Sequence, residues 1–98
     1  MDIRINSVRF DHSEQLEQFI QKKVGKLDKY FEGIITVDVI LRVVKPESSI
    51  NKKVELKVNV PNNELFADKT ADSFEEALDL TIDAVKKQLT KHKEKLKR

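Results

Sequence analysis

Basic side chains gather in two stretches of this 98-residue chain, and both stretches have the residue spacing of a helix. The first stretch holds four lysines, Lys22, Lys23, Lys26 and Lys29. The second has seven basic residues against one acid: Lys86, Lys87, Lys91, Lys93, Lys95, Lys97 and Arg98. Ammonium groups repeated along a helix neutralise phosphates, so these residues could bind a polyanion such as a nucleic acid.

The charge of the C-terminal helical pattern changes sign halfway along. From Asp72 to Asp83 every ionisable residue is acidic, whereas from Lys86 onward nearly all are basic. Acids near the start of a helix and bases near its end complement the helix dipole, which explains this order. Because that effect fades within one turn, it does not explain seven basic residues. The net charge is only +2, so a nucleic-acid interpretation depends on where the charges lie.

The first basic stretch divides the polar side of its helix into two flanks. At about 100° per residue, Lys22, Lys26 and Lys29 fall on one flank, with Lys23 at the edge of the apolar face. The acids fall on the other flank, which comprises Glu14, Glu17, Asp28 and Glu32. From the residues alone two interpretations stay open, an ordinary solvated face and a functional basic strip.

Other chemistry has little support in the sequence. There is no cysteine, and His12 and His92 lie in different elements without the spacing of a metal pair. His92 falls among apolar positions, so we expect it to be a packing residue. Asp79 and Asp83 are four residues apart, which predicts a solvated helix face. Glycine-rich phosphate loops and the common hydrolase motifs are absent from the sequence. We therefore expect no enzyme, no cofactor and no metal.

The first half of the chain predicts a strand and a helix. Alternation of Ile3 and Ile5 with polar residues predicts a strand over Met1–Arg9. Ser13 is the favoured N-cap of a helix that extends to Glu32, and Gly33 supplies a conformation that commonly ends helices. The apolar residues of this helix lie on one face: Leu16, Phe19, Ile20, Val24, Leu27, Tyr30 and Phe31.

The second half predicts three strands and a long helix. Their expected ranges are Ile34–Val44, Lys52–Val60, Glu64–Lys69 and Ser73–Arg98. The asparagines of a turn at Pro61–Asn63 can adopt left-handed conformations, and Phe66 should point away from the apolar face of its strand. Ser73 and Glu76 have the spacing of a capping box. In the last helix an apolar stripe continues through both charged halves, with Phe74, Ala77, Leu78, Ile82, Val85, Leu89 and Leu96.

This order of elements predicts an α+β fold. It is a two-layer β-α-β-β-β-α arrangement, with a four-stranded mixed sheet and both helices on one face. The helices would then be neighbours, and the basic flank of the first could face the basic half of the second across a groove suited to phosphates. We expect a single domain over residues 1–98. No apolar run approaches the roughly 20 residues of a membrane span, and no signal peptide is evident, so we expect a cytoplasmic protein.

With this order of elements in view, the chain resembles the short form of the ribosome hibernation promoting factor family, also labelled sigma-54 modulation protein. The resemblance covers nearly the whole chain. It is carried by Lys23, Lys26-Leu27 and Tyr30-Phe31, by the segment from Val60 to Ala67, by Ala77-Leu78-Asp79, and by Gln88-Leu89 with Lys87, Lys91 and Lys93. The C-terminal tail and the Ala-Leu-Asp element together are the most specific part.

The resemblance implies a protein that binds the small ribosomal subunit. Its basic helices would lie on rRNA in the mRNA and tRNA channel, and it would inhibit translation in stationary or starved cells. The rRNA contacts of the family carry over onto Lys22, Lys23, Lys26, Lys29, Lys86, Lys87, Lys91, Lys93 and Lys95. The family's long form has a C-terminal dimerisation domain that we do not expect here, so ribosome dimerisation would need a separate protein.

The sequence departs from the family pattern in three places. Glu75 stands where the family often has an aromatic residue, and Asn62-Asn63 stands where it often has a Gly-Gly turn. Lys86 and Lys87 occupy positions where one basic residue is more common. An alternative function is a protein-interaction module that modulates a sigma factor, in which the lysines are solvated and the open sheet face or an edge strand meets a protein.

Overall fold

The structure is a computed structural model that describes residues 1–45 and 47–96. Its elements follow the order β1 (Asp2–Ser7), α1 (Glu14–Gly25), α2 (Leu27–Tyr30), β2 (Thr36–Val43), β3 (Lys52–Val60), β4 (Asn63–Ala71) and α3 (Phe74–Leu96). Lys97 and Arg98, which the sequence places at the end of the last helix, lie outside the described residues. Within the described part, no helix is long and apolar enough to cross a membrane.

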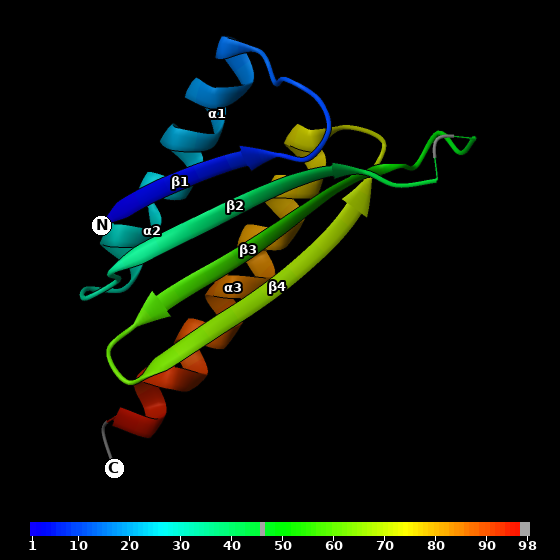
Figure 1. Ribbon diagram of the computed structural model, residues 1–98. Coiled ribbons are helices and arrows are strands. Elements are labelled where there is room, and N and C mark those ends of the chain that lie inside the picture. The colour runs from blue at the N-terminus through cyan, green and yellow to red at the C-terminus, as the bar shows by residue number, and fades with distance from the viewer. Residues whose placement is uncertain (46, 97–98) are drawn as a thin grey trace.

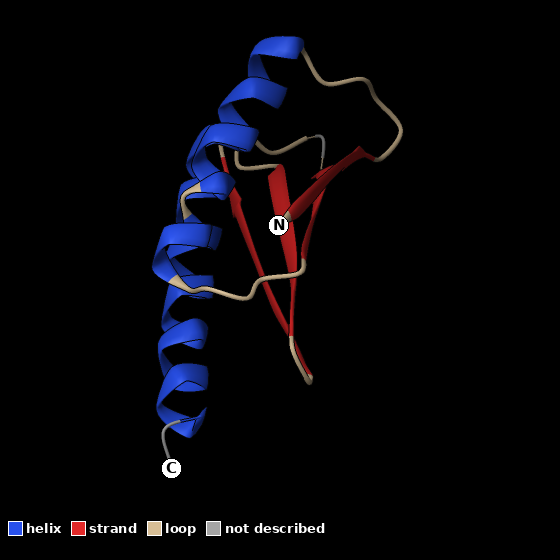
Figure 2. Cartoon of the chain, turned by 90° about the vertical axis from the view of Figure 1, so that its left-hand side faces the viewer, coloured by secondary structure: helices blue, strands red, loops and turns tan. Residues whose placement is uncertain are grey.

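The four strands form one sheet in the order β1-β2-β3-β4. β1 is parallel to β2, whereas β2, β3 and β4 are successively antiparallel, as the connections predict. Figure 2 shows the helices in one layer and the sheet in the other, which confirms the predicted α+β architecture. The opposite sheet face carries ion pairs between neighbouring strands, including Arg42 with Glu55 at 2.9 Å and Lys53 with Asp68 at 3.8 Å.

The core lies between the sheet and the helices. Its sheet side is made by alternate residues of the strands, because successive side chains of a strand point to opposite faces. Val54, Leu56 and Val58 of β3 are fully buried. Residues of α3 close the core from the other layer with Ala77, Leu78, Ile82, Val85 and Leu89, which are five of the seven residues of the predicted stripe. Phe74 is partly buried against the core, and the side chain of Leu96 lies outside what the structure describes. Thr81 of α3 is a fully buried polar residue whose hydroxyl donates to the main-chain oxygen of Ala77 at 2.6 Å.

The predicted helix over Ser13–Glu32 is interrupted at Lys26 and ends at Tyr30, two residues earlier than predicted. Ser13 is the N-cap and accepts from the Leu16 N–H at 3.1 Å, but α1 ends at Gly25. Gly25 is a weak helix former, and the N–H of Lys26 then bonds the Lys23 oxygen three residues back. The short helix α2 follows and ends where Phe31 becomes extended. Gly33 has φ of 98°, so it serves the next turn and does not end the helix.

Strand ends also shift from their predicted positions. β4 begins at Asn63 and reaches Ala71, because Asn63 pairs with Val60 and Ala71 pairs with Lys52. The turn is therefore two residues long, and Asn62 takes the left-handed conformation with φ of 65°. β1 is shorter than predicted, and beyond its end Arg9 has φ of 66°, which is incompatible with an extended strand.

Candidate nucleic-acid interface

The two main helices lie side by side and point in the same direction, with the C-terminal turns of α3 extending past α2 (Figure 1). Because the two helices run in the same direction, each charged residue of α1 faces the residues of α3 that lie at the same level along the helix axes. The C-terminal end of α1 therefore lies beside the middle of α3, where the charge of α3 changes from acidic to basic.

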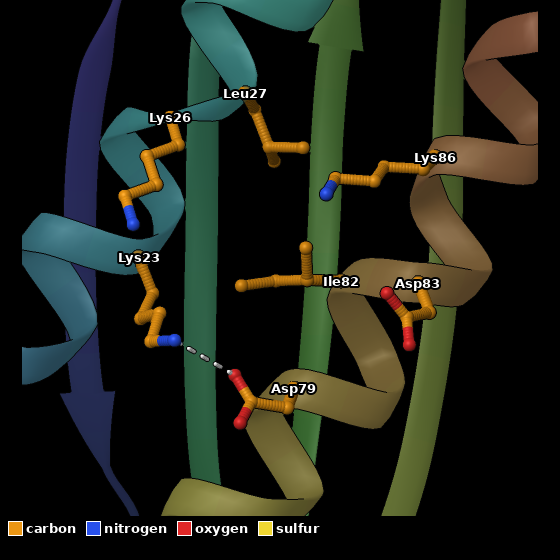
Figure 3. A pocket seen from close by; sticks show the side chains of 7 residues that line it. All are labelled: Lys23, Lys26, Leu27, Asp79, Ile82, Asp83 and Lys86. Atoms are coloured by element: carbon orange, nitrogen blue, oxygen red, sulfur yellow. Dashed lines mark ion pairs between the residues drawn. The ribbon is translucent and has the colours of Figure 1, made fainter.

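The groove between α1 and α3 has mixed charge. It is a hollow of about 370 Å³ lined by Lys23, Lys26, Leu27, Asp79, Ile82, Asp83 and Lys86 (Figure 3). Lys23 Nζ lies 3.7 Å from an oxygen of Asp79, and Lys86 points from α3 toward α1. The predicted meeting of two basic flanks is therefore wrong for this groove. The prediction had fixed no direction for the second helix, and the parallel arrangement brings Asp79 and Asp83 opposite the lysines of α1.

Tyr30 is the centre of a second contact, between α2 and α3. Its hydroxyl hydrogen-bonds to the hydroxyl of Thr90, and its ring lies 5.8 Å from Lys86 Nζ and 5.0 Å from Lys93 Nζ. Lys93 Nζ also donates to the main-chain oxygen of Tyr30 at 2.5 Å. A lysine at the C-terminal end of a helix satisfies a free carbonyl and complements the dipole. Lys86 and Lys93 thus hold α2 against α3.

Three predicted lysines of α3 lie on a different flank. Gln88 points toward β4, since its Nε2 donates to the main-chain oxygen of Phe66 at 2.8 Å. At about 100° per residue, Lys87, Lys91 and Lys95 lie between that flank and the side opposite the core. All three are exposed. They form a row along the outer side of α3, turned away from the groove, and we call them the outer row.

The nine predicted lysines therefore form three sets. Lys22, Lys26 and Lys29 are exposed on α1, α2 and the turn between them. Lys23, Lys86 and Lys93 contact neighbouring helices, and the first two are half-buried. Lys87, Lys91 and Lys95 make up the outer row. The structure does not bring all nine into one groove; it spreads them over one end of the helical layer.

The role of Tyr30 was missed by the sequence reasoning, which placed it only as an apolar residue. The sequence did indicate such a contact, because a tyrosine on a core-facing stripe needs a hydrogen-bond partner for its hydroxyl. His92 is 9% exposed and its ring lies 5.6 Å from that of Phe31, which confirms its predicted packing role. Asp79 was predicted on a solvated face, and it is exposed but pairs with Lys23.

A further contact that the sequence reasoning missed ties the β1–α1 connection together. Ser7 Oγ bonds to His12 Nδ1, and His12 Nε2 bonds to Glu17 at 2.8 Å. These three residues are five apart in the sequence, a spacing with no helical or strand period. Among the described residues, no group of three or more histidine, cysteine, aspartate or glutamate side chains could hold a metal ion.

Comparison with known proteins assigns the chain to a family. Residues 3–97 match the family described as Sigma 54 modulation protein / S30EA ribosomal protein. The chain belongs to this family. A ribosome hibernation promoting factor of Escherichia coli K12 is 33% identical over 97 residues, covering 99% of this chain and 98% of the relative. A protein of the same name from Azotobacter vinelandii is 30% identical over 95 residues, covering 97% and 85%.

Solved structures of similar proteins agree with the fold of this family member. A ribosomal subunit interface protein from Coxiella burnetii has a TM-score of 0.84 at 22% identity, covering 95% of this chain and 98% of that one. The N-terminal domain of Thermus thermophilus Protein Y has a TM-score of 0.80 at 18% identity, covering 94% and 99%. At these identities the similarity supports the architecture alone.

Proposed function

We propose that this protein is a ribosome hibernation factor that binds the small ribosomal subunit through rRNA phosphates and inhibits translation. The observation that carries the proposal is the exposure of lysines on one end of the helical layer of a chain whose relatives are named ribosome hibernation promoting factors. The protein would be cytoplasmic and ribosome-associated, and residues 1–98 would act as one ribosome-binding domain without a cofactor.

The lysines would have different roles in binding. Lys22, Lys26 and Lys29, together with the outer row, present exposed ammonium groups that can reach phosphates. Lys23, Lys86 and Lys93 would contribute partly through the packing of α1 and α2 on α3, because their ammonium groups contact Asp79 or Tyr30. Recognition would depend on backbone shape and charge, since phosphate contacts carry no direct sequence information.

Inhibition would follow from competition. A compact domain held on rRNA in the mRNA and tRNA channel occupies the space that those ligands need. Such binding suits stationary or starved cells, in which idle ribosomes accumulate.

Co-sedimentation with purified small subunits in sucrose gradients tests the proposal. We expect binding at low salt that falls steeply as salt rises, because each phosphate contact releases counterions. We also expect the bound protein to reduce the binding of mRNA and of tRNA to the same subunits. Absence of binding at low salt would refute the proposal, and would favour the alternative of a sigma-factor interaction module. Binding that leaves mRNA and tRNA unaffected would refute the competitive mechanism.

A further inference from the structure

The geometry points to a second interaction surface, at the free edge of β4, that takes an extended basic segment of a protein as an added strand. This surface lies away from the groove between α1 and α3, and its ligand is a protein rather than RNA. It therefore goes beyond the proposed function.

β4 offers main-chain groups for such pairing. It is the last strand in the sheet order and has nine residues, so its side away from β3 has no strand partner in the described part of the chain. Gln88 bonds the main-chain oxygen of Phe66 from α3, which shows that this oxygen faces the free edge. Because main-chain groups alternate along a strand, the N–H and C=O groups of Asp68 and Thr70 face the same edge. An extended segment can bond to them in register.

Apolar side chains lie exposed beside this edge. Ile50 is 58% exposed and Leu80 is 42% exposed, although both are large hydrophobic residues. They line a hollow of about 210 Å³ together with Thr70, Ala71, Asp72 and Glu76. An incoming strand would place every second side chain toward this hollow, so an apolar residue at alternate positions would cover Ile50 and Leu80.

The charge around the edge selects a basic occupant. Asp72 and Glu76 are exposed acids that line the hollow. The pKa of Glu76 is raised, first by a hydrogen bond with Asp72, then by charge repulsion from Asp72, and then by burial. Lysine or arginine side chains of a partner would relieve this repulsion. A strand that alternates basic and apolar residues thus matches both the charges and the apolar hollow.

The test uses the whole chain and a synthetic peptide of β4 length that alternates lysine and valine. Binding is followed by NMR of the ¹⁵N-labelled protein, and a peptide with glutamate in place of lysine is the control ligand. We expect the amides of Asp68 and Thr70 to shift and to exchange more slowly when the lysine peptide binds. No binding, equal binding of the glutamate peptide, or shifts confined to the lysine-rich turns of α3 would overturn the proposal.

Two variants localise the surface. Leu80→Ser and the double variant Asp72→Asn with Glu76→Gln should each weaken binding of the lysine peptide about threefold to tenfold. A matched control, Asp28→Asn with Glu94→Gln, removes the same charge elsewhere and should leave binding unchanged. Equal weakening by the control variant would mean a nonspecific charge effect and would refute the site. The amide spectrum itself reports whether each variant is folded. Peptide binding does not depend on ribosomes, so a failure here and a failure of ribosome binding are distinguishable.

Discussion

The ammonium group of Lys93 donates to the main-chain oxygen of Tyr30, the last residue of α2, at 2.5 Å. A lysine from the basic end of α3 therefore caps the C-terminus of α2, although the two residues are 63 positions apart in the sequence. This contact couples the proposed RNA-binding turns of α3 to the placement of Lys29 and its neighbours in α2.

Lys93→Ala should destabilise the protein, whereas Lys95→Ala should not. The first change removes a hydrogen bond and an ammonium group over the Tyr30 ring, at a cost of about 1 kcal/mol. The second removes an exposed lysine and should change the free energy of unfolding by less than about 0.5 kcal/mol. Urea denaturation followed by circular dichroism measures both. Equal stability of the two variants would contradict the role of Lys93.

Tyr30→Phe should lower the free energy of unfolding by about 0.5–1.5 kcal/mol, because the hydrogen bond between the Tyr30 and Thr90 hydroxyls is lost. Thr90→Val removes the same bond and also the one from Thr90 to the Lys86 oxygen. A double-mutant cycle isolates the shared contact, and we expect a coupling of about 0.5–1 kcal/mol. Additive effects would show that the two hydroxyls do not interact in solution.

Replacing the three lysines of the outer row by alanine should weaken binding to small subunits and reduce its salt dependence. Each phosphate contact contributes roughly 0.7–0.9 to the slope of log affinity against log salt, so losing three contacts should lower the slope by about 2 to 3. Filter binding at several salt concentrations measures this slope. A native circular dichroism spectrum with an unchanged slope would exclude Lys87, Lys91 and Lys95 from the interface.

Neutralising the acids of the groove should strengthen binding to small subunits. Asp79 pairs with Lys23 across a partly exposed contact, so Asp79→Asn frees that lysine for phosphate at little cost in stability. Together with Asp83→Asn we expect about a fivefold tighter complex. Glu94→Gln with Asp28→Asn gives the same change in net charge and is the control. Equal tightening in both double variants would mean that only total charge matters.

Asp72→Asn should flatten the dependence of stability on pH. The pKa of Glu76 is raised in the folded state by Asp72, so the folded protein binds this proton more tightly than the unfolded chain. The protonated Glu76 side chain therefore stabilises the folded protein at acid pH, and this stabilisation is lost as the pH rises through the raised pKa. The variant should be more stable than the parent at neutral pH and lose that advantage in acid. Thermal unfolding across this pH range checks the sign.

Much of the fold follows from local patterns in the sequence. β3 has the predicted bounds Lys52–Val60, because strict alternation of apolar and polar residues leaves only one face for the core. Ser13 and Ser73 cap their helices as expected, with hydrogen bonds to the N–H groups of Leu16 and Glu76. The break at Lys26 was not predicted, since the apolar stripe continues across it and hides the change in hydrogen bonding.

The sequence by itself determined which residues lie on which face of each element. Only the tertiary structure decided which charges meet. Lys23 faces Asp79 instead of a lysine because α1 and α3 run in the same direction at a particular offset. Direction and offset come from packing residues far apart in the chain against a common sheet, so no local periodicity encodes them. The outer row and the free edge of β4 become separate surfaces for the same reason.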